Sequence, residues 1–255
     1  MLEIVIKRVP LLISLILFVT FTEGALATVT KVPRELLSSS LLTLRSPVIS
    51  CKSNSCNYAE SNLIKDHPDM GQIEIADQKY LQISIVTPRQ ASEIFAEMQA
   101  QPQIPFRYPE DGCYARADEM AWLLEAKGLI VAKVFAQGFL RYQTKHNSQL
   151  TINMFWRNYH VAPILLVETS PKNLQITVID PSMFDRPVSS ARWLLEMTQY
   201  PETKLTSMDY ANRFNWEPPL NNRLSEYTEE RIQVSKTYMA KFLEKQRLRE
   251  LNLPQ

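Results

Sequence analysis

The sequence predicts an α+β fold, in which helices and strands fall in separate parts of the chain. A helical pattern begins at Cys113 and runs to Gly128, with apolar residues at helical spacing. Short apolar runs at 130–135, 159–167 and 175–179 follow it and are typical of strands. A helix followed by consecutive strands, rather than alternating with them, indicates helices packed on one sheet. We expect that sheet to be antiparallel.

A second helix is predicted immediately upstream of the first. Thr87 supplies a hydroxyl cap, Pro88 suits the first helical position, and Gln90 completes a capping box. The prolines at 102 and 105 end this helix. Before it, apolar and polar residues alternate between Gln72 and Val86, which predicts strand structure with a turn at 76–79.

The remaining segments are less regular. Residues 138–155 are polar and predict a loop, and Pro163 within the second strand candidate predicts an edge position or a bulge. Residues 191–197 predict a short helix that carries Trp193, whereas 201–222, rich in proline, asparagine and aromatic residues, predict irregular structure. A long amphipathic helix is expected over 228–251. Its inward side chains would be Ile232, Val234, Tyr238, Met239 and Phe242.

Composition limits the classes of partner. The chain has 255 residues, of which 45% are hydrophobic, so one medium domain with appendages can form a core. A net charge of +1 gives no electrostatic attraction for nucleic acid or for an anionic membrane surface. We therefore expect no nucleic-acid partner.

The first 27 residues have the pattern of a signal peptide. Lys7 and Arg8 precede an apolar run at 9–21, and Ala25 and Ala27 form a small-x-small cleavage site. The apolar run is shorter than the ~20 residues of a membrane-spanning helix. The pattern predicts export to the periplasm or the medium, without stable membrane association after cleavage; the alternative is an uncleaved anchor.

Three cysteines in an exported chain leave one unpaired. Cys51 and Cys56 lie in one polar loop and suit a local disulfide, which leaves Cys113 free. A free thiol is a liability in an oxidising compartment, so its presence favours a chemical role. The alternative is that all three are reduced and buried. No zinc-ligand spacing occurs, so no metal is expected.

Cys113, His160 and Asp180 are the candidate catalytic residues. Cys113 follows a Pro/Gly-punctuated turn and opens a helix, where the helix dipole favours the thiolate. His160 opens a strand and could exchange its proton with the thiol, while Asp180, before Pro181, could orient the imidazole. His67 and His146 lie in polar segments and are expected to be exposed. A core histidine and an Asp-Pro turn are the competing structural explanations.

Three motifs resemble the bacterial protein-glutaminases, whose fold is similar to the transglutaminase and papain-like core. They are Phe-Arg-Tyr-Pro-x-Asp-Gly-Cys-Tyr-Ala-Arg-Ala at 106–117, Tyr-His-Val-Ala at 159–162 and Ile-Asp-Pro-Ser-x-Phe at 179–184. The resemblance covers about residues 88–200. It implies deamidation of protein-bound glutamine to glutamate through a thioester, with Cys113 as nucleophile, His160 as base and Asp180 as its orienting partner. It implies no cofactor, and protein or peptide substrates with exposed glutamine.

The resemblance also suggests how the chain divides. We expect a signal peptide at 1–27, a leading segment at 28–86, a catalytic domain at 87–215 and a C-terminal helical extension at 216–255. The leading segment is either an inhibitory pro-region, as in the family, or an integral subdomain. The extension and Pro163 depart from the family pattern. Transglutaminase-type transfer to an amine and an inactive target-binding relative remain alternatives; the papain Cys-Gly-Ser-Cys-Trp segment is absent.

Overall fold

The computed structural model describes residues 29–31, 69–76, 79–108, 111–143, 151–154, 159–171, 173–219 and 229–252. Its helices are α2 (Pro88–Gln99), α3 (Cys113–Ala126), α4 (Ser190–Thr198) and α5 (Glu229–Glu250). Its strands are β1 (Val29–Lys31), β2 (Met70–Ala76), β3 (Lys79–Val86), β4 (Ala132–Gln143), β5 (Thr151–Met154), β6 (Tyr159–Ser170), β7 (Asn173–Val178), β8 (Val188–Ser189) and β9 (Lys204–Asn212). The predicted signal peptide and the predicted Cys51–Cys56 disulfide lie outside the described residues.

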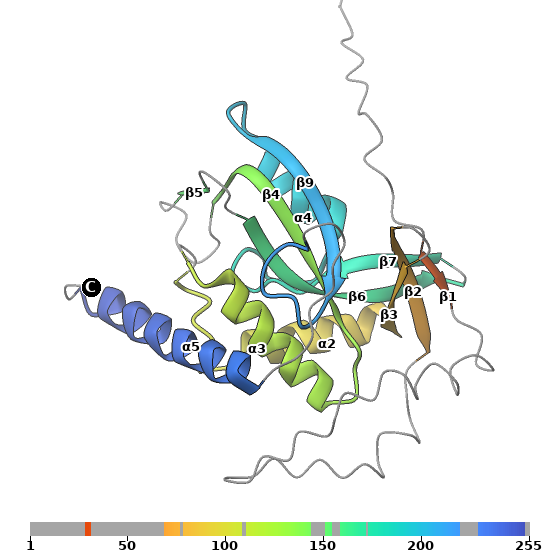
Figure 1. Cartoon of the computed structure of the whole chain (residues 1–255), viewed down its shortest axis with the longest axis horizontal. Helices are drawn as coiled ribbons and strands as arrows, with labels where there is room; N and C mark the ends of the chain where they lie inside the picture. The colour runs from red at the N-terminus through yellow and green to blue at the C-terminus, as the bar shows by residue number, and fades with distance from the viewer. Residues whose placement is uncertain are drawn as a thin grey trace, which may run out of the picture.

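The strands of the described residues form one mixed sheet around β4 and β6 (Figure 1). β6 pairs antiparallel with β4 and β7, and β4 pairs antiparallel with β5 and β9. β3 adds a short parallel pairing to β6, and β2 and β1 continue from β3. The expectation of helices on a largely antiparallel sheet is confirmed.

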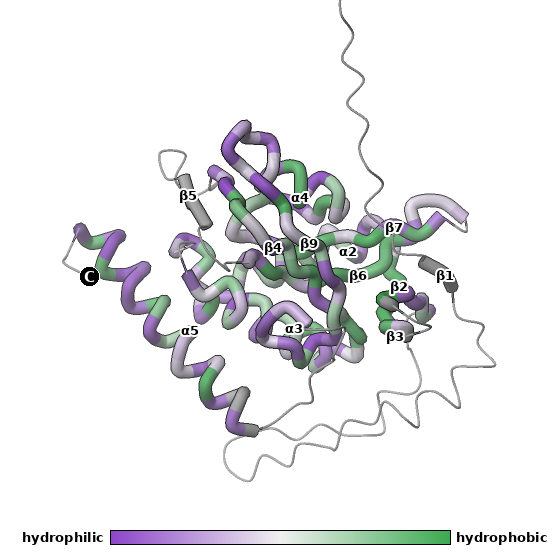
Figure 2. The backbone as a smooth tube through the Cα atoms, turned by 45° about the horizontal axis from the view of Figure 1, so that its top comes forward, coloured by the Kyte–Doolittle hydropathy of each residue, from purple (hydrophilic) through white to green (hydrophobic). Residues whose placement is uncertain are grey.

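The alternation of side chains along β6 separates two apolar layers. Ala162, Ile164 and Leu166 face the layer that holds α4, with Trp193 and Met197 at its centre. Leu165 and Val167 point to the opposite layer, formed with α2 and α3. The tube along β6 is accordingly coloured mostly as hydrophobic (Figure 2). The pairing of β6 with β4 places His160 opposite Ala136, at the start of the strand.

The local signals upstream of the site are confirmed. Thr87 accepts a hydrogen bond from the Gln90 N–H, and the Gln90 side chain accepts one from Thr87, forming the capping box of α2. Gly128 follows the end of α3 with φ of 82°, a left-handed conformation that glycine adopts readily. The alternating stretch forms the hairpin of β2 and β3.

Two predictions of irregular structure are wrong. The strand that was expected to end near 135 continues as β4 to Gln143, and β5 covers 151–154. Within the segment expected to be irregular, β9 runs from 204 to 212 beside β4. Most side chains of β9 are only half-buried, so the strand lacks the apolar alternation that sequence reasoning relies on.

Pro163 lies in β6, which is an internal strand. At Pro163 itself β6 pairs with β4 on one side, and the pairing with β7 on the other side begins only at Ile164. The pairing of β7 with β6 ends at Val178, opposite Ile164. The carbonyl of Pro163 accepts the next N–H, that of Ile179, at 3.0 Å. The nitrogen of a strand residue points to the same side as its carbonyl, so the missing N–H of Pro163 removes no bond to β4.

The long C-terminal helix is present as α5, but one of its predicted inward residues is wrong. Met239 and Phe242 are buried, whereas Val234 is 39% exposed. The buried face instead includes the polar residues Ser235 and Gln246. No helix of the described residues is long and apolar enough to cross a membrane.

Candidate active site

Cys113 is the first residue of α3. Gly112 caps the helix in the left-handed conformation, with φ of 76°. No side chain caps this helix end, and the Gly112 N–H is bonded to Oδ1 of Asp111 at 2.6 Å. The first N–H groups of a helix have no partner within it, so those at the start of α3 form a site for developing negative charge.

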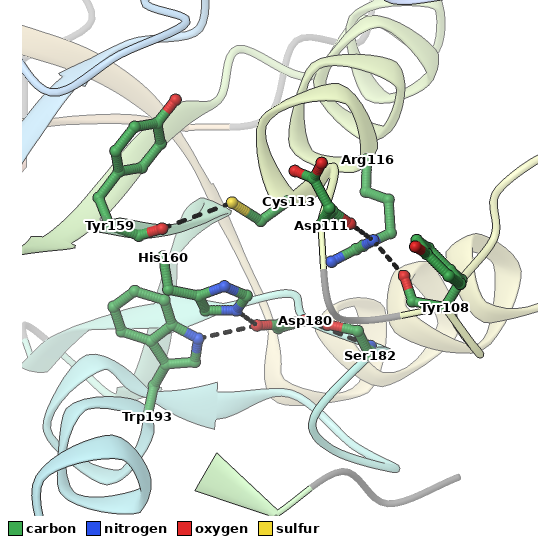
Figure 3. A network of polar contacts seen from close by, with 9 residues as sticks. All are labelled: Tyr108, Asp111, Cys113, Arg116, Tyr159, His160, Asp180, Ser182 and Trp193. Carbon is green, nitrogen blue, oxygen red and sulfur yellow. Dashed lines mark hydrogen bonds and ion pairs between the residues drawn. The ribbon is translucent and has the colours of Figure 1, made fainter. Parts of the chain in front are cut away.

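Arg116, one turn into α3, braces the turn before the nucleophile. Its Nη1 donates to the carbonyl oxygens of Tyr108 and Asp111 at 2.8 and 2.6 Å (Figure 3). The side chain is almost fully buried, and a charged donor gives stronger hydrogen bonds than a neutral one. Arg116 therefore fixes the chain on both sides of residues 109–110.

Helix α5 holds the same turn from outside. Gln246 accepts the backbone N–H of Arg107 at 3.0 Å, and Glu250 pairs with the Arg107 guanidinium at 2.8 Å. The ring of Phe242 stacks on that of Tyr108, with centroids 5.8 Å apart. A Cβ at Gly112 would lie 2.5 Å from the Phe242 ring, so only glycine fits between this ring and Cys113.

His160 lies at the start of β6, beside the thiol. The carbonyl of the preceding residue, Tyr159, accepts from Cys113 Sγ at 3.6 Å. His160 itself points to the layer of α4, where it packs against Tyr142 and Trp193 with ring centroids 5.1 and 5.5 Å away. Its Nδ1 is buried and has no hydrogen-bond partner among the described residues, and Figure 3 places the imidazole between Cys113 and Asp180.

Asp180 follows β7 and contacts the other nitrogen of the imidazole. Nε2 of His160 lies 2.7 Å from Oδ2 of Asp180, and both side chains are almost fully buried. Oδ1 of Asp180 accepts the hydroxyl and the N–H of Ser182 at 2.5 and 3.2 Å. Oδ2 also accepts Nε1–H of Trp193 at 2.9 Å. Each carboxylate oxygen thus has two partners, as a buried charge requires.

The two buried groups shift each other's ionisation. Burial alone would lower the pKa of His160, but the charge and hydrogen bond of Asp180, with a contribution from Cys113, raise it to about 9. Burial would raise the pKa of Asp180, but His160, Ser182 and Trp193 lower it to about 2. At neutral pH the pair is therefore an imidazolium and a carboxylate.

Cys113, His160 and Asp180, the three predicted residues, thus lie together in the structure. Other residues at the site were not predicted. Cys113 is free and 9% exposed. The roles of Ser182, Trp193 and α5 were not expected, because they depend on contacts between segments that no local pattern links. No group of three or more His, Cys, Asp or Glu that could hold a metal ion occurs in the described part of the chain.

Residues 91–197 match the model of a family described as Glutaminase. This segment, which is less than half of the chain, is therefore similar to that family. It contains all three candidate residues. No curated protein matches the chain.

Solved protein-glutaminase structures have the same fold. A pro-protein-glutaminase is 24% identical, with a TM-score of 0.54, over 67% of this chain and 62% of that one. A protein-glutaminase is 21% identical, with a TM-score of 0.51, over 62% of this chain and 90% of that one. The protein-glutaminase of Chryseobacterium proteolyticum is 24% identical, with a TM-score of 0.53, over 62% of this chain and 88% of that one. The chain thus spans about 62% of the length of the pro-protein-glutaminase that it matches.

Proposed function

We propose that the protein deamidates glutamine side chains of proteins, with Cys113 as nucleophile. The observation that carries the proposal is the contact between Nε2 of His160 and Asp180, which holds the imidazole beside the Cys113 thiol. A base with one nitrogen held by a buried carboxylate is fixed in one orientation, which is the arrangement that nucleophilic acyl transfer needs. The family match over 91–197 supports glutamine as the substrate.

The chemistry follows in two steps. The Cys113 thiolate attacks the carboxamide carbon, and the N–H groups at the start of α3 stabilise the oxyanion. The His160 imidazolium then protonates the departing nitrogen, so that ammonia leaves and a thioester remains. Neutral His160 next removes a proton from water, the hydroxide attacks the thioester, and glutamate is released with the thiol regenerated.

The Tyr159 carbonyl favours an amide substrate. It accepts from Cys113 Sγ at 3.6 Å when no substrate is bound. When Cys113 is the thiolate that attacks the substrate, this carbonyl no longer accepts from Sγ and can accept an N–H of the carboxamide. An ester offers no such donor, which gives a reason for amide selectivity at this site.

The test is ammonia release from a glutamine-rich unfolded protein such as casein. We expect wild-type protein to release ammonia and Cys113→Ala to lose at least about 10³-fold of the rate while melting at the wild-type temperature. His160→Ala should be as damaging. Full activity in Cys113→Ala would rule out the assignment. Incorporation of an added amine into casein at the expense of ammonia would instead indicate a transglutaminase.

We further propose export, with cleavage after Ala27, from the charged and apolar pattern of residues 1–27. Mass spectrometry of the protein recovered outside the cytoplasm of a bacterial host should give Thr28 as its first residue. In that protein Cys51 and Cys56 should be bonded to each other, and alkylation under native conditions should modify Cys113 alone. Retention of residues 1–27 would contradict the proposal.

The inhibitory pro-region is best sought before β2. The hairpin of β2 and β3 places Ile73, Leu81 and Ile83 in the core, all at most 4% exposed, so its loss would uncover apolar surface. We expect protein that starts at Asp69 to release ammonia faster than protein that starts at Thr28, with a similar melting temperature. Protein that starts at Thr87 should melt far lower. Equal rates for the first two proteins would show that residues 28–68 do not inhibit.

A further inference from the structure

Trp193 joins the layer of α4 to the histidine–aspartate pair. The residue is 0% exposed, and its indole donates to Oδ2 of Asp180, the same oxygen that holds His160. The indole also lies nearly parallel to the imidazole, with 25° between the ring planes. One side chain therefore fixes both the carboxylate and the plane of the ring that this carboxylate orients (Figure 3).

The position of Trp193 is set where β8 (Val188–Ser189) leads into α4. Ser189 caps α4, its hydroxyl accepting the N–H of Arg192, and Trp193 follows one residue later. Trp193 and Met197 are the buried residues of this short helix. A buried indole N–H requires an acceptor, and in this protein the acceptor is the anionic partner of the base.

We propose that Trp193 is a positioning residue of this site, whose N–H keeps Asp180, and through it His160, oriented so that the imidazole faces Cys113. The benefit of Trp193 to catalysis rests on the proposed function. Its effect on the reactivity of the Cys113 thiol can be measured without a substrate. Without the N–H, Oδ2 of Asp180 would keep one partner, and the carboxylate could rotate away from Nε2. The imidazole would then stabilise the thiolate less.

The groups that face His160 come from four elements. They are Cys113 at the start of α3, Asp180 after β7, Tyr142 on β4 and Trp193 on α4. Two of these groups, Cys113 and Asp180, change the pKa of His160 directly. Trp193 carries no charge, so its effect on the thiol must pass through the orientation of Asp180 and the ring.

The variant Trp193→Phe keeps an aromatic ring against His160 and removes only the donor. The readout is the alkylation of Cys113 by iodoacetamide between pH 5 and 10, followed by mass spectrometry of the Cys113 peptide. This measurement needs no glutamine substrate. We expect the rate at pH 7 to fall at least fivefold.

Phe95→Leu is the matched control for lost stability. Phe95 is 2% exposed in α2, in the opposite layer, and touches none of these groups. It should lower the melting temperature and leave the alkylation profile within twofold of wild type. If Trp193→Phe also keeps the wild-type alkylation rate, the proposal is wrong.

Ammonia release provides the second readout. With casein as substrate, Trp193→Phe should lower kcat at least tenfold and change KM less than twofold, because the substituted group touches no substrate. A rise in KM with unchanged kcat would contradict a positioning role. If wild-type protein releases no ammonia, the proposed function fails, while the alkylation profile still tests Trp193.

Discussion

The two halves of the site are held in different ways. The histidine–aspartate half is built from neighbouring elements, since His160, Asp180 and Trp193 lie within 34 positions of one another and are joined by buried hydrogen bonds. The thiol half depends on contact with a distant helix, because Gln246 and Arg107 are 139 residues apart. Hydrogen bonds and ring packing occur in both halves, but only the nucleophile turn receives them from a helix as distant in the sequence as α5. Substitutions in the histidine–aspartate half should therefore change the pH dependence, whereas substitutions in the thiol half should change the unfolding free energy.

The largest effect is expected in the first half, from Asp180→Asn. The amide keeps the shape of the side chain and loses the charge that raises the pKa of His160, while the burial that lowers this pKa remains. We expect ammonia release to fall roughly 10²–10⁴-fold, by analogy with other triads. The rate of Cys113 alkylation at pH 7 should fall with it. A variant with wild-type activity would show that the carboxylate charge plays no part.

In the second half, Phe242→Ala should act through packing. Removal of a buried ring of this size costs about 3–5 kcal/mol of unfolding free energy, measured by urea denaturation. Activity should fall because the Tyr108–Gly112 turn loses the ring that it packs against. The pH dependence of the residual activity should stay as in wild type, since His160 and Asp180 are untouched.

Val234→Ala is the control on the same helix. Val234 is 39% exposed, so its truncation should change the unfolding free energy by less than about 0.5 kcal/mol. If Phe242→Ala moved the pH profile as Asp180→Asn does, the two halves would not be separate.

The smallest effect is the pH dependence of stability, to which His160 and Asp180 contribute at opposite ends of the pH range. The raised pKa of His160 gives stability that is complete below the unfolded value of ~6.5 and is lost as the pH rises through about 9. The lowered pKa of Asp180 gives stability that is present above ~3.9 and is lost as the pH falls toward 2. Urea midpoints measured from pH 2 to 10 should fall at both ends. In Asp180→Asn the decline near pH 9 should disappear.

The sequence predicted the elements that carry strong local signals. Thr87 and Gln90 begin a helix by the chemistry of their own side chains, and the turn before Cys113 begins another, so their positions were predicted correctly. His160 lies in a continuous apolar run that forms a strand buried on both faces. The grouping of Cys113, His160 and Asp180 was first proposed from the turn and strand contexts of the three residues, and the family motifs then supported it.

What the sequence did not predict depends on tertiary contact. β9 forms beside β4 without apolar alternation, because most of its side chains are only half-buried. On α5 the buried face includes the polar residues Ser235 and Gln246. A prediction based on apolar residues therefore placed the exposed Val234 on that face by mistake. The hydrogen bond from Trp193 to Asp180 spans a turn and a strand, and an aromatic residue in a short helix gives no sign of such a bond.

The contact between α5 and the turn before Cys113 has a consequence for the order in which the protein matures. The ribosome completes Arg107 and Gly112 long before Phe242 and Gln246, so the nascent chain carries its thiol without the helix that packs against this turn. The packing that positions the nucleophile therefore forms only after α5 has been synthesised. Chains that stop before α5 should then carry Cys113 in a turn that lacks the Phe242 ring and the Gln246 hydrogen bond.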